Sequence, residues 1–224
     1  SALRNAANSS EVMDRIRSET GLTIEVISGE QEAALIAKGT ALAMQDLNES
    51  FLVMDIGGGS TEFVLREGNV LHFKKSIEIG ATRLIERCGL SDPLDDDQIA
   101  CMRHNIADGF KPRTEVIERI PTRSLVGGSG TFDTLRSMMQ LESDRPIVQY
   151  DTRALLDLLD RIITSDRTTR TLMDGLVDFR IDTIVPSALM VQHFLTQGIR
   201  KIFWSRYALK EGVMQEIAEN SAPA

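Results

Sequence analysis

The chain has 224 residues, which is enough for one large hydrophobic core or two small ones. Hydrophobic residues make up 42% and charged residues 26%, and this composition excludes a disordered or collagen-like chain. A net charge of −8 argues against a general nucleic-acid-binding surface. Because no apolar run approaches the ~20 residues that span a bilayer and no secretory signal is visible, we expect a cytoplasmic protein that binds neither nucleic acid nor membranes.

The cysteines and histidines show no metal-binding spacing. Cys88 and Cys101 lack a CxxC pattern and are expected to be reduced packing residues. His72, His104 and His193 lie far apart in the sequence and are expected to be ordinary surface or core residues. The sequence therefore predicts neither a zinc site nor a disulfide framework.

Extended apolar runs alternate with helical patterns, which predicts a layered α/β protein. The run 51–56 is apolar on both faces and ends in three glycines, so we expect a buried central strand, followed by a meander of two more strands about the turn 67–69. Pro112 is expected to break or restart the helix whose start is marked by acids at 95–97. The remaining expected elements are, in chain order, a helix at 11–19, a strand at 23–28, helices at 29–44 and 81–88, a strand running into a second glycine turn at 127–131, helices at 132–140, 152–163 and 183–197, a strand at 201–205 and a helix at 207–219.

The segment DIGGGSTEF, residues 55–63, is the strongest functional signal. Its three glycines let the backbone turn tightly and bring successive N–H groups close to a bound anion. Asp55 is placed to orient the waters of a Mg²⁺ ion, which prefers carboxylate, water and phosphate oxygens. Glu62, on the outgoing strand, would address the same metal or a nucleophilic water. The alternative is a plain glycine-rich hairpin with two solvated acids, but the flanking buried strand favours a phosphate-binding hairpin.

Two further segments leave two interpretations open. The turn GGSGT, residues 127–131, opens a helix whose first amides would bind phosphate, or it is simply a sharp connection capped by Ser or Thr. The segment SGEQEA, residues 28–33, puts Glu30 and Glu32 at the head of a helix. These acids either complement the helix dipole or, aimed into a phosphate cleft, position and deprotonate water.

Short motifs follow one another in the order ALRNAAN, IEVISGEQEA, DIGGGSTEFV, SIEIGATRL, GGSGT, FRID and SRYALKEGVM. From Ser1 to about Met214 this order resembles the exopolyphosphatase and guanosine pentaphosphate phosphohydrolase family (Ppx/GppA). DIGGGSTE beside SGxxEA is the specific part of the resemblance, and the order of the other motifs adds to it. The family belongs to the sugar kinase, heat-shock chaperone and actin superfamily, whose two ribonuclease-H-like domains enclose a phosphate-lined cleft.

The resemblance implies an α/β, ribonuclease-H-like fold with a mixed sheet flanked by helices. It also implies Mg²⁺-dependent hydrolysis of a terminal phosphoanhydride bond in inorganic polyphosphate or guanosine pentaphosphate. By position, Glu32 resembles the catalytic base, Asp55 and Glu62 the metal-associated acids with Glu62 also catalytic, and Arg4 an arginine that steadies phosphate. The implied backbone cradles for phosphate are Gly57, Gly58, Gly59 and Ser60, and Gly128, Ser129, Gly130 and Thr131.

One departure from the family pattern concerns an upstream hairpin. Family members begin with a further strand and phosphate hairpin of the form D-x-G-S-N-S, which is not present in these 224 residues. We therefore expect a truncated member, with 1–33 as the remnant of the first ribonuclease-H-like domain and 34–224 as the second.

Activity and substrate are less tightly determined than the family. An ATPase or kinase of the same superfamily and a non-catalytic (p)ppGpp or polyphosphate sensor are the alternatives to a hydrolase. The basic clusters Lys74-Lys75 and Arg200-Lys201 are small, so a short polyphosphate or guanosine pentaphosphate is at least as well supported as a long chain. A monomer and a homodimer are both left open.

Overall fold

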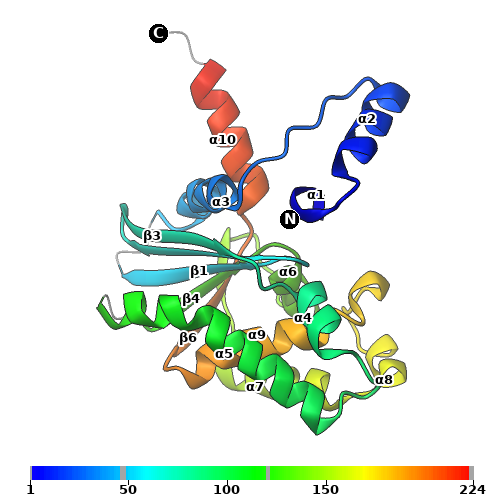
Figure 1. Ribbon diagram of the computed structural model, residues 1–224. Coiled ribbons are helices and arrows are strands. Elements are labelled where there is room, and N and C mark those ends of the chain that lie inside the picture. The colour runs from blue at the N-terminus through cyan, green and yellow to red at the C-terminus, as the bar shows by residue number, and fades with distance from the viewer. Residues whose placement is uncertain (1, 46–48, 120–121, 222–224) are drawn as a thin grey trace.

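The computed structural model describes residues 2–45, 49–119 and 122–221, with the side chains of 112–119 excepted. These residues form a six-stranded mixed sheet in the order β3-β2-β1-β4-β6-β5 (Figure 1). The first three strands are an antiparallel meander, β4 and β6 run parallel to β1, and β5 is antiparallel to β6. The strands are β1 (Ser50–Ile56), β2 (Thr61–Glu67), β3 (Val70–Ile77), β4 (Ser124–Gly128), β5 (Ile147–Gln149) and β6 (Lys201–Ser205).

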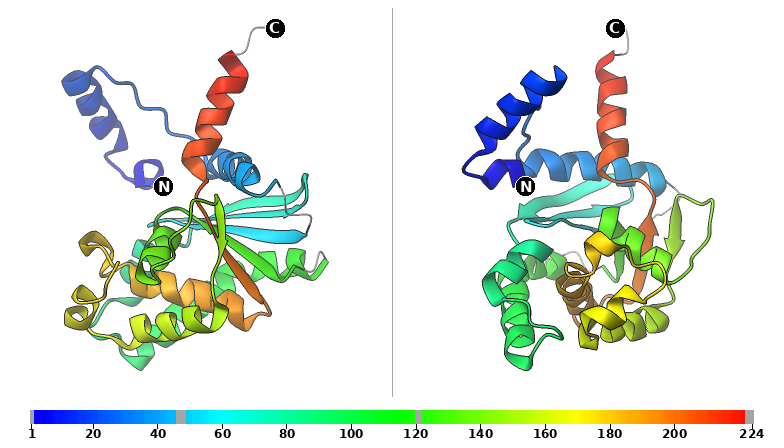
Figure 2. Two further views of the ribbon diagram at one scale, coloured as in Figure 1. Left: turned by 180° about the vertical axis from the view of Figure 1, so that it is seen from behind. Right: turned by 90° about the vertical axis from the view of Figure 1, so that its right-hand side faces the viewer.

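Helices cover both faces of the sheet (Figures 1 and 2). One face carries α3 (Gly29–Ala43) and α10 (Leu209–Ser221). The other carries α4 (Ala81–Cys88), α5 (Asp96–Arg119), α6 (Ser129–Met138), α7 (Thr152–Thr164) and α9 (Ile184–Thr196). The expected α/β fold with a mixed sheet flanked by helices is thus confirmed.

Strand β1 is central, as its apolar run predicts. Leu52 and Met54 pack into the core beneath α5 and α9, whereas Phe51 and Val53 pack toward α3, because successive side chains of a strand point to opposite faces. All four are at most 1% exposed. Full burial of a side chain of this size stabilises the fold by about 1.5–3 kcal/mol, so β1 anchors both layers.

Helices α3 and α10 meet backbone to backbone at two glycines. A Cβ on Gly39 would collide with the carbonyl oxygen of Ala208, and a Cβ on Gly212 would collide with that of Leu35. Glycine is required for this close approach, since any side chain would separate the helices. Lys38 adds ion pairs of 2.9 Å from α3 to glutamates of α10. These contacts with α10 therefore fix the position of α3 and of the acids in its first turn.

The N-terminal segment extends away from the sheet (Figure 2). Helices α1 (Ala2–Asn5) and α2 (Ser9–Thr20) contain no buried residue, and α2 confirms the helix expected at 11–19. The strand expected at 23–28 is wrong: this segment joins α2 to α3 and pairs with no strand of the described sheet. An alternating apolar pattern makes a strand only where a sheet edge is available. The predicted boundary at residue 33 lies within α3, and the division into 1–33 and 34–224 stays a prediction.

Several boundaries differ from the sequence pattern. Helix α5 continues through Pro112, contrary to the expected break. The carbonyl that loses its donor is that of Asp108, an exposed residue, so it is accessible to solvent and the helix tolerates the proline. Helix α6 starts directly at Ser129 and not at 132. The pattern missed the short elements β5, α8 (Arg167–Thr171) and η1 (Asp178–Arg180).

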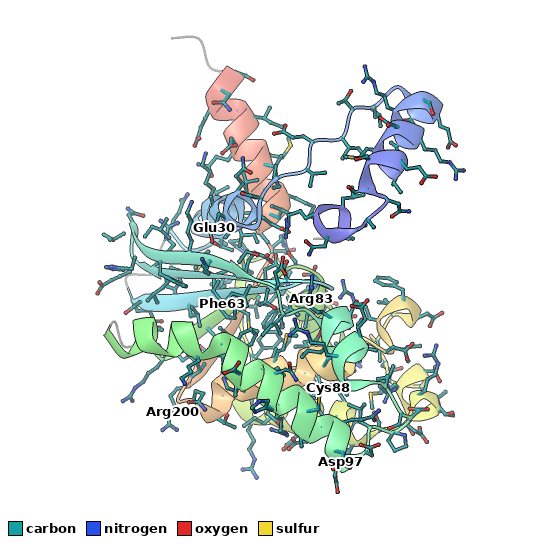
Figure 3. The ribbon with its side chains drawn as sticks, in the orientation of Figure 1. Glu30, Phe63, Arg83, Cys88, Asp97 and Arg200 are labelled. Carbon is teal, nitrogen blue, oxygen red and sulfur yellow. A yellow bond between two sulfur atoms is a disulfide. The ribbon has the colours of Figure 1, made fainter. Side chains whose placement is uncertain are left out.

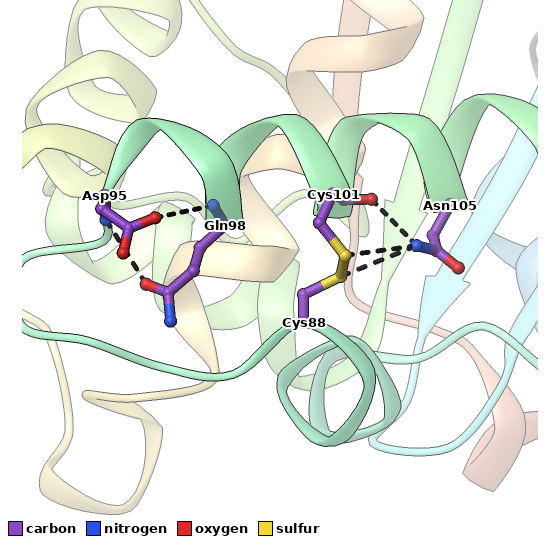
Figure 4. Close-up of a disulfide and its surroundings, with 5 residues drawn as sticks. All are labelled: Cys88, Asp95, Gln98, Cys101 and Asn105. Atoms are coloured by element: carbon purple, nitrogen blue, oxygen red, sulfur yellow. Dashed lines mark hydrogen bonds between the residues drawn. A yellow bond between two sulfur atoms is a disulfide. The ribbon is translucent and has the colours of Figure 1, made fainter.

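The expectation of two reduced cysteines is also wrong. Cys88, at the end of α4, and Cys101, in α5, form a disulfide with a Cα–Cα distance of 5.8 Å (Figure 4). The loop between the helices turns α5 back along α4, and a sequence separation of 13 does not reveal that approach.

The acidic start expected for α5 is confirmed. Asp95 accepts a hydrogen bond from the backbone N–H of Gln98 at 2.8 Å.

Membrane-spanning helices and clusters of metal ligands are both absent from the described residues. In the parts of the chain that the structure covers, we find no helix both long and apolar enough to cross a membrane. Within the same residues, no group of three or more His, Cys, Asp or Glu side chains is arranged to hold a metal ion.

Candidate functional site

The two glycine turns lie side by side at one edge of the sheet. Strands β1 and β4 are parallel neighbours, and Asp55 is in register with Gly128. The hairpin after β1 and the turn after β4 therefore emerge together at the carboxyl ends of their strands, the usual place of ligand sites in open α/β sheets. The structure thus brings together two segments that lie about 70 residues apart in the chain.

The carbonyl groups of the first hairpin are held by α4. Ala81 N donates to the carbonyl of residue 57 at 3.0 Å, and Arg83 N to that of residue 58 at 3.1 Å. The Arg83 side chain donates from Nε to the carbonyl of residue 59 at 2.9 Å. These bonds tie the carbonyls of residues 57–59 to α4, while the amides of residues 58–60 have no acceptor among the described residues. Successive unpaired amides of this kind form an anion-binding concavity.

The second turn presents the N-terminus of α6. Gly128 is its N-cap and no side chain caps it, and the first amides of a helix have no acceptor within the helix itself. Ser129 has a φ of 60°, in the left-handed region that residues with a Cβ rarely adopt. A left-handed serine at a helix start is a local strain of the kind found at ligand sites. Both predicted phosphate cradles therefore lie at the same edge, one with unpaired hairpin amides and the other with an uncapped helix N-terminus.

Asp55 lies between the two turns. Its side chain is 7% exposed and accepts the Ser129 hydroxyl on Oδ2 at 2.6 Å. Burial raises the pKa of Asp55 to about 7; the Ser129 hydroxyl opposes this shift, and the carboxylates of Glu62, Glu32 and Asp133 add to it. Negative charge is therefore crowded at this position.

Glu62 is buried at the start of β2. It is 2% exposed, and its Oε1 accepts the hydroxyls of Ser76 at 2.7 Å and Ser60 at 2.8 Å. Burial raises the pKa of Glu62, and the nearby Glu32 carboxylate raises it further, whereas the two serine hydroxyls and Arg4 lower it. Its Oε2 accepts nothing from the described residues and remains available to a ligand.

Arg4 and Glu32 complete the site from outside the sheet. A capping box of Ser28 and Gln31 starts α3 and sets the direction of its first turn. Arg4 Nη1 donates to Glu32 Oε2 at 2.6 Å, and Arg4 Nη2 donates to Ser60 Oγ at 3.3 Å. Both side chains are 19% exposed. The predicted base and the predicted arginine therefore meet at the glycine hairpin.

Glu30, the other acid in the first turn of α3, does not point to the site. Glu30 lies on the outer side of α3, where it is half exposed and 3.5 Å from Lys75 (Figure 3). The helix-dipole interpretation therefore suits Glu30, whereas Glu32 points to the site. The sequence pattern alone did not show which of the two glutamates complements the helix dipole and which points to the site.

Arg180 is a residue that the sequence analysis did not single out. Its guanidinium packs against Gly130, where a Cβ would collide with it, so glycine is required there. Burial lowers the pKa of Arg180, and the carboxylates of Asp133 and Asp55 oppose that shift. Arg180 and the first hairpin line one cavity of about 200 Å³ together with Thr131. The FRID motif carried this arginine, but only the fold shows where it points.

This fold and this site define a class: an α/β protein with a mixed sheet flanked by helices, in which two glycine turns lie beside buried carboxylates. Residues 1–221 match the model of the Ppx/GppA phosphatase family. The chain therefore belongs to the Ppx/GppA phosphatase family.

Two relatives with different printed activities match most of the chain. Exopolyphosphatase 2 of Mycobacterium tuberculosis is 29% identical over 213 residues, which are 88% of this chain and 65% of that protein. Guanosine-5'-triphosphate,3'-diphosphate pyrophosphatase of Aeromonas salmonicida is 28% identical over 228 residues, which are 98% of this chain and 44% of that protein. The chain thus spans less than two thirds of the length of either relative.

Solved structures show the same fold. An exopolyphosphatase from Cytophaga hutchinsonii superimposes with a TM-score of 0.92 at 31% identity, over 99% of this chain and 74% of that one. The Ppx/GppA family member from Aquifex aeolicus gives a TM-score of 0.76 at 24% identity, over 99% of this chain and 73% of that one.

Proposed function

We propose that this chain carries the phosphate-binding and catalytic groups of a phosphoanhydride hydrolase. Its substrate is the terminal phosphate of inorganic polyphosphate or of guanosine pentaphosphate. The observation that carries the proposal is the convergence of the unpaired hairpin amides and the uncapped N-terminus of α6 with Asp55, Glu62 and Glu32 at one edge of the sheet. The printed names of the relatives, which include both activities, support it.

Glu32 is the proposed general base. Its Oε2 is held by Arg4, whereas its Oε1 accepts nothing from the described residues and is available to a water molecule. In the proposed step the water oxygen bonds to the terminal phosphorus, the bond to the leaving phosphate breaks, and the water proton passes to Glu32. The amides of 58–60 and 129–131 donate to the phosphate oxygens, where the charge of the transition state lies.

The carboxylates suit a magnesium ion. Asp55 and Glu62 are buried, and their raised pKa values show that ionisation without a cation is disfavoured. Mg²⁺ takes one or two carboxylates and completes its shell with water and phosphate oxygens, so a larger protein ligand group is not needed. When bound, the ion would offset negative charge on the phosphates.

An assay of phosphate release tests the proposal. The protein is incubated with polyphosphate, guanosine pentaphosphate or ATP, with Mg²⁺ or with EDTA, and orthophosphate is measured. We expect release from polyphosphate, guanosine pentaphosphate or both, in the presence of Mg²⁺. Release from ATP alone would identify an ATPase or kinase instead. Calorimetric binding of (p)ppGpp without turnover of any substrate would identify a sensor and overturn the hydrolase.

A further inference from the structure

Arg83 reaches from α4 to the tip of the first glycine hairpin (Figure 3). Its backbone N and its side-chain Nε are both occupied by hairpin carbonyls, at 3.1 Å and 2.9 Å. These two bonds hold the guanidinium beside the unpaired amides of residues 58–60. The position of the guanidinium is therefore fixed by the same contacts that shape the hairpin.

Among the residues that the structure describes, the outer nitrogens of Arg83 make no hydrogen bond and one long ion pair. The nearest carboxylate is that of Glu78, whose Oε2 lies 3.9 Å from Nη1, beyond hydrogen-bond distance. Arg4, in contrast, is occupied by Glu32 at 2.6 Å. In the part of the chain that the structure describes, both Nη atoms of Arg83 thus keep their N–H donors for another acceptor.

These donors face an open cavity of about 550 Å³. Its walls include Gly58, Gly59 and Thr82 beside Arg83, and Asn5, whose side-chain amide donates to Glu78 Oε1 at 3.4 Å. Unpaired backbone amides and a guanidinium are groups that bind phosphate oxygens. Glu86, one turn further along α4, lines the same cavity, and its carboxylate disfavours additional phosphates beyond Arg83.

We propose that Arg83 is a phosphate-binding residue of the substrate site, which contacts a phosphate group bound in this cavity next to the hairpin tip. The proposal rests on the proposed function and deepens it, because it adds the side of the hairpin that faces α4 to the substrate site. A short phosphate chain fits the charge of the cavity, with Arg83 near the hairpin and Glu86 beyond it.

Binding of inorganic tripolyphosphate, measured by calorimetry, tests the role of Arg83. The variants are Arg83→Met, Arg83→Lys and the control Arg87→Met, which removes an exposed arginine one turn along the same helix. We expect Arg83→Met to weaken binding about tenfold, the effect of losing one charge-assisted hydrogen bond, and Arg87→Met to stay within about twofold of the parent. Arg83→Lys should lie between them, since it keeps the charge without the fork of donors.

Thermal unfolding of the same variants separates binding from support of the hairpin. If Arg83→Met binds tripolyphosphate as well as Arg87→Met does, the inference is wrong. It is also wrong if Arg83→Lys and Arg83→Met lose the same affinity and the same Tm, because Arg83 would then only hold the hairpin. Failure of the parent protein to bind tripolyphosphate would overturn the proposed function itself.

Discussion

Ser129 donates its hydroxyl to Asp55 Oδ2 at 2.6 Å, across 74 residues of sequence. This bond joins the first residue of α6 to the carboxyl end of β1, and so ties the two glycine turns together. The donor sits in left-handed backbone and the acceptor is a buried carboxylate with a raised pKa. The Ser129–Asp55 hydrogen bond therefore joins a residue with a strained backbone to a buried carboxylate.

Substitutions at Ser129 should report the strain. Ser129→Ala and Ser129→Gly both remove the hydroxyl, but only alanine keeps a Cβ at a φ of 60°. Since the left-handed region costs an L-residue about 1 kcal/mol relative to glycine, we expect the alanine variant to unfold at lower urea, with a free energy of unfolding about 1 kcal/mol smaller. An alanine variant as stable as the glycine variant would contradict this backbone conformation.

Asp55 should make stability fall as pH rises. Its pKa of about 7 in the folded protein exceeds its ordinary 3.8, so the folded state holds the proton more tightly. The resulting stabilisation is complete below about pH 4 and is lost as pH rises through 7. We expect Asp55→Asn to reduce the loss of unfolding free energy between pH 5 and pH 8 by on the order of 2 kcal/mol, in urea titrations with EDTA. Equal pH dependence in both proteins would refute the assignment.

Glu32→Gln should abolish turnover and leave substrate binding largely intact. The amide keeps an oxygen that can accept from Arg4 but cannot take a proton from water, so we expect phosphate release to fall at least about 100-fold. Glu30→Gln is the matched control, since Glu30 lies two residues before Glu32 in α3 and faces Lys75. Release by Glu32→Gln at the parental rate would show that another group is the base.

The Cys88–Cys101 disulfide should stabilise the packing of α4 on α5. Closing a loop with a separation of 13 residues contributes about 3 kcal/mol in the chain-entropy model. We expect dithiothreitol to lower the unfolding free energy by about this amount and to have no effect on the Cys88→Ser, Cys101→Ser double variant. A thiol reagent that finds two free thiols in the unreduced, denatured protein would disprove the bond.

Much of the architecture followed from local patterns. The double-sided apolar run of 51–56 predicted a buried strand because only a strand covered on both faces tolerates it. The hairpin after it followed from glycine chemistry, and the helix at 29–44 from its acidic start. The strand at 23–28 and the break at Pro112 failed because they depended on the surroundings, a missing sheet edge in one case and an exposed helix face in the other.

The sequence by itself determined the family resemblance, the two glycine turns and the acids beside them, since these are short segments whose chemistry is local. Only the tertiary structure decided that Glu32 pairs with Arg4 whereas Glu30 pairs with Lys75, that Arg83 and Arg180 flank the hairpin, and that the cysteines meet. Direction, burial and distance between remote side chains depend on how β1, β4 and the helices pack. That packing is a property of the whole core, which no short segment encodes alone.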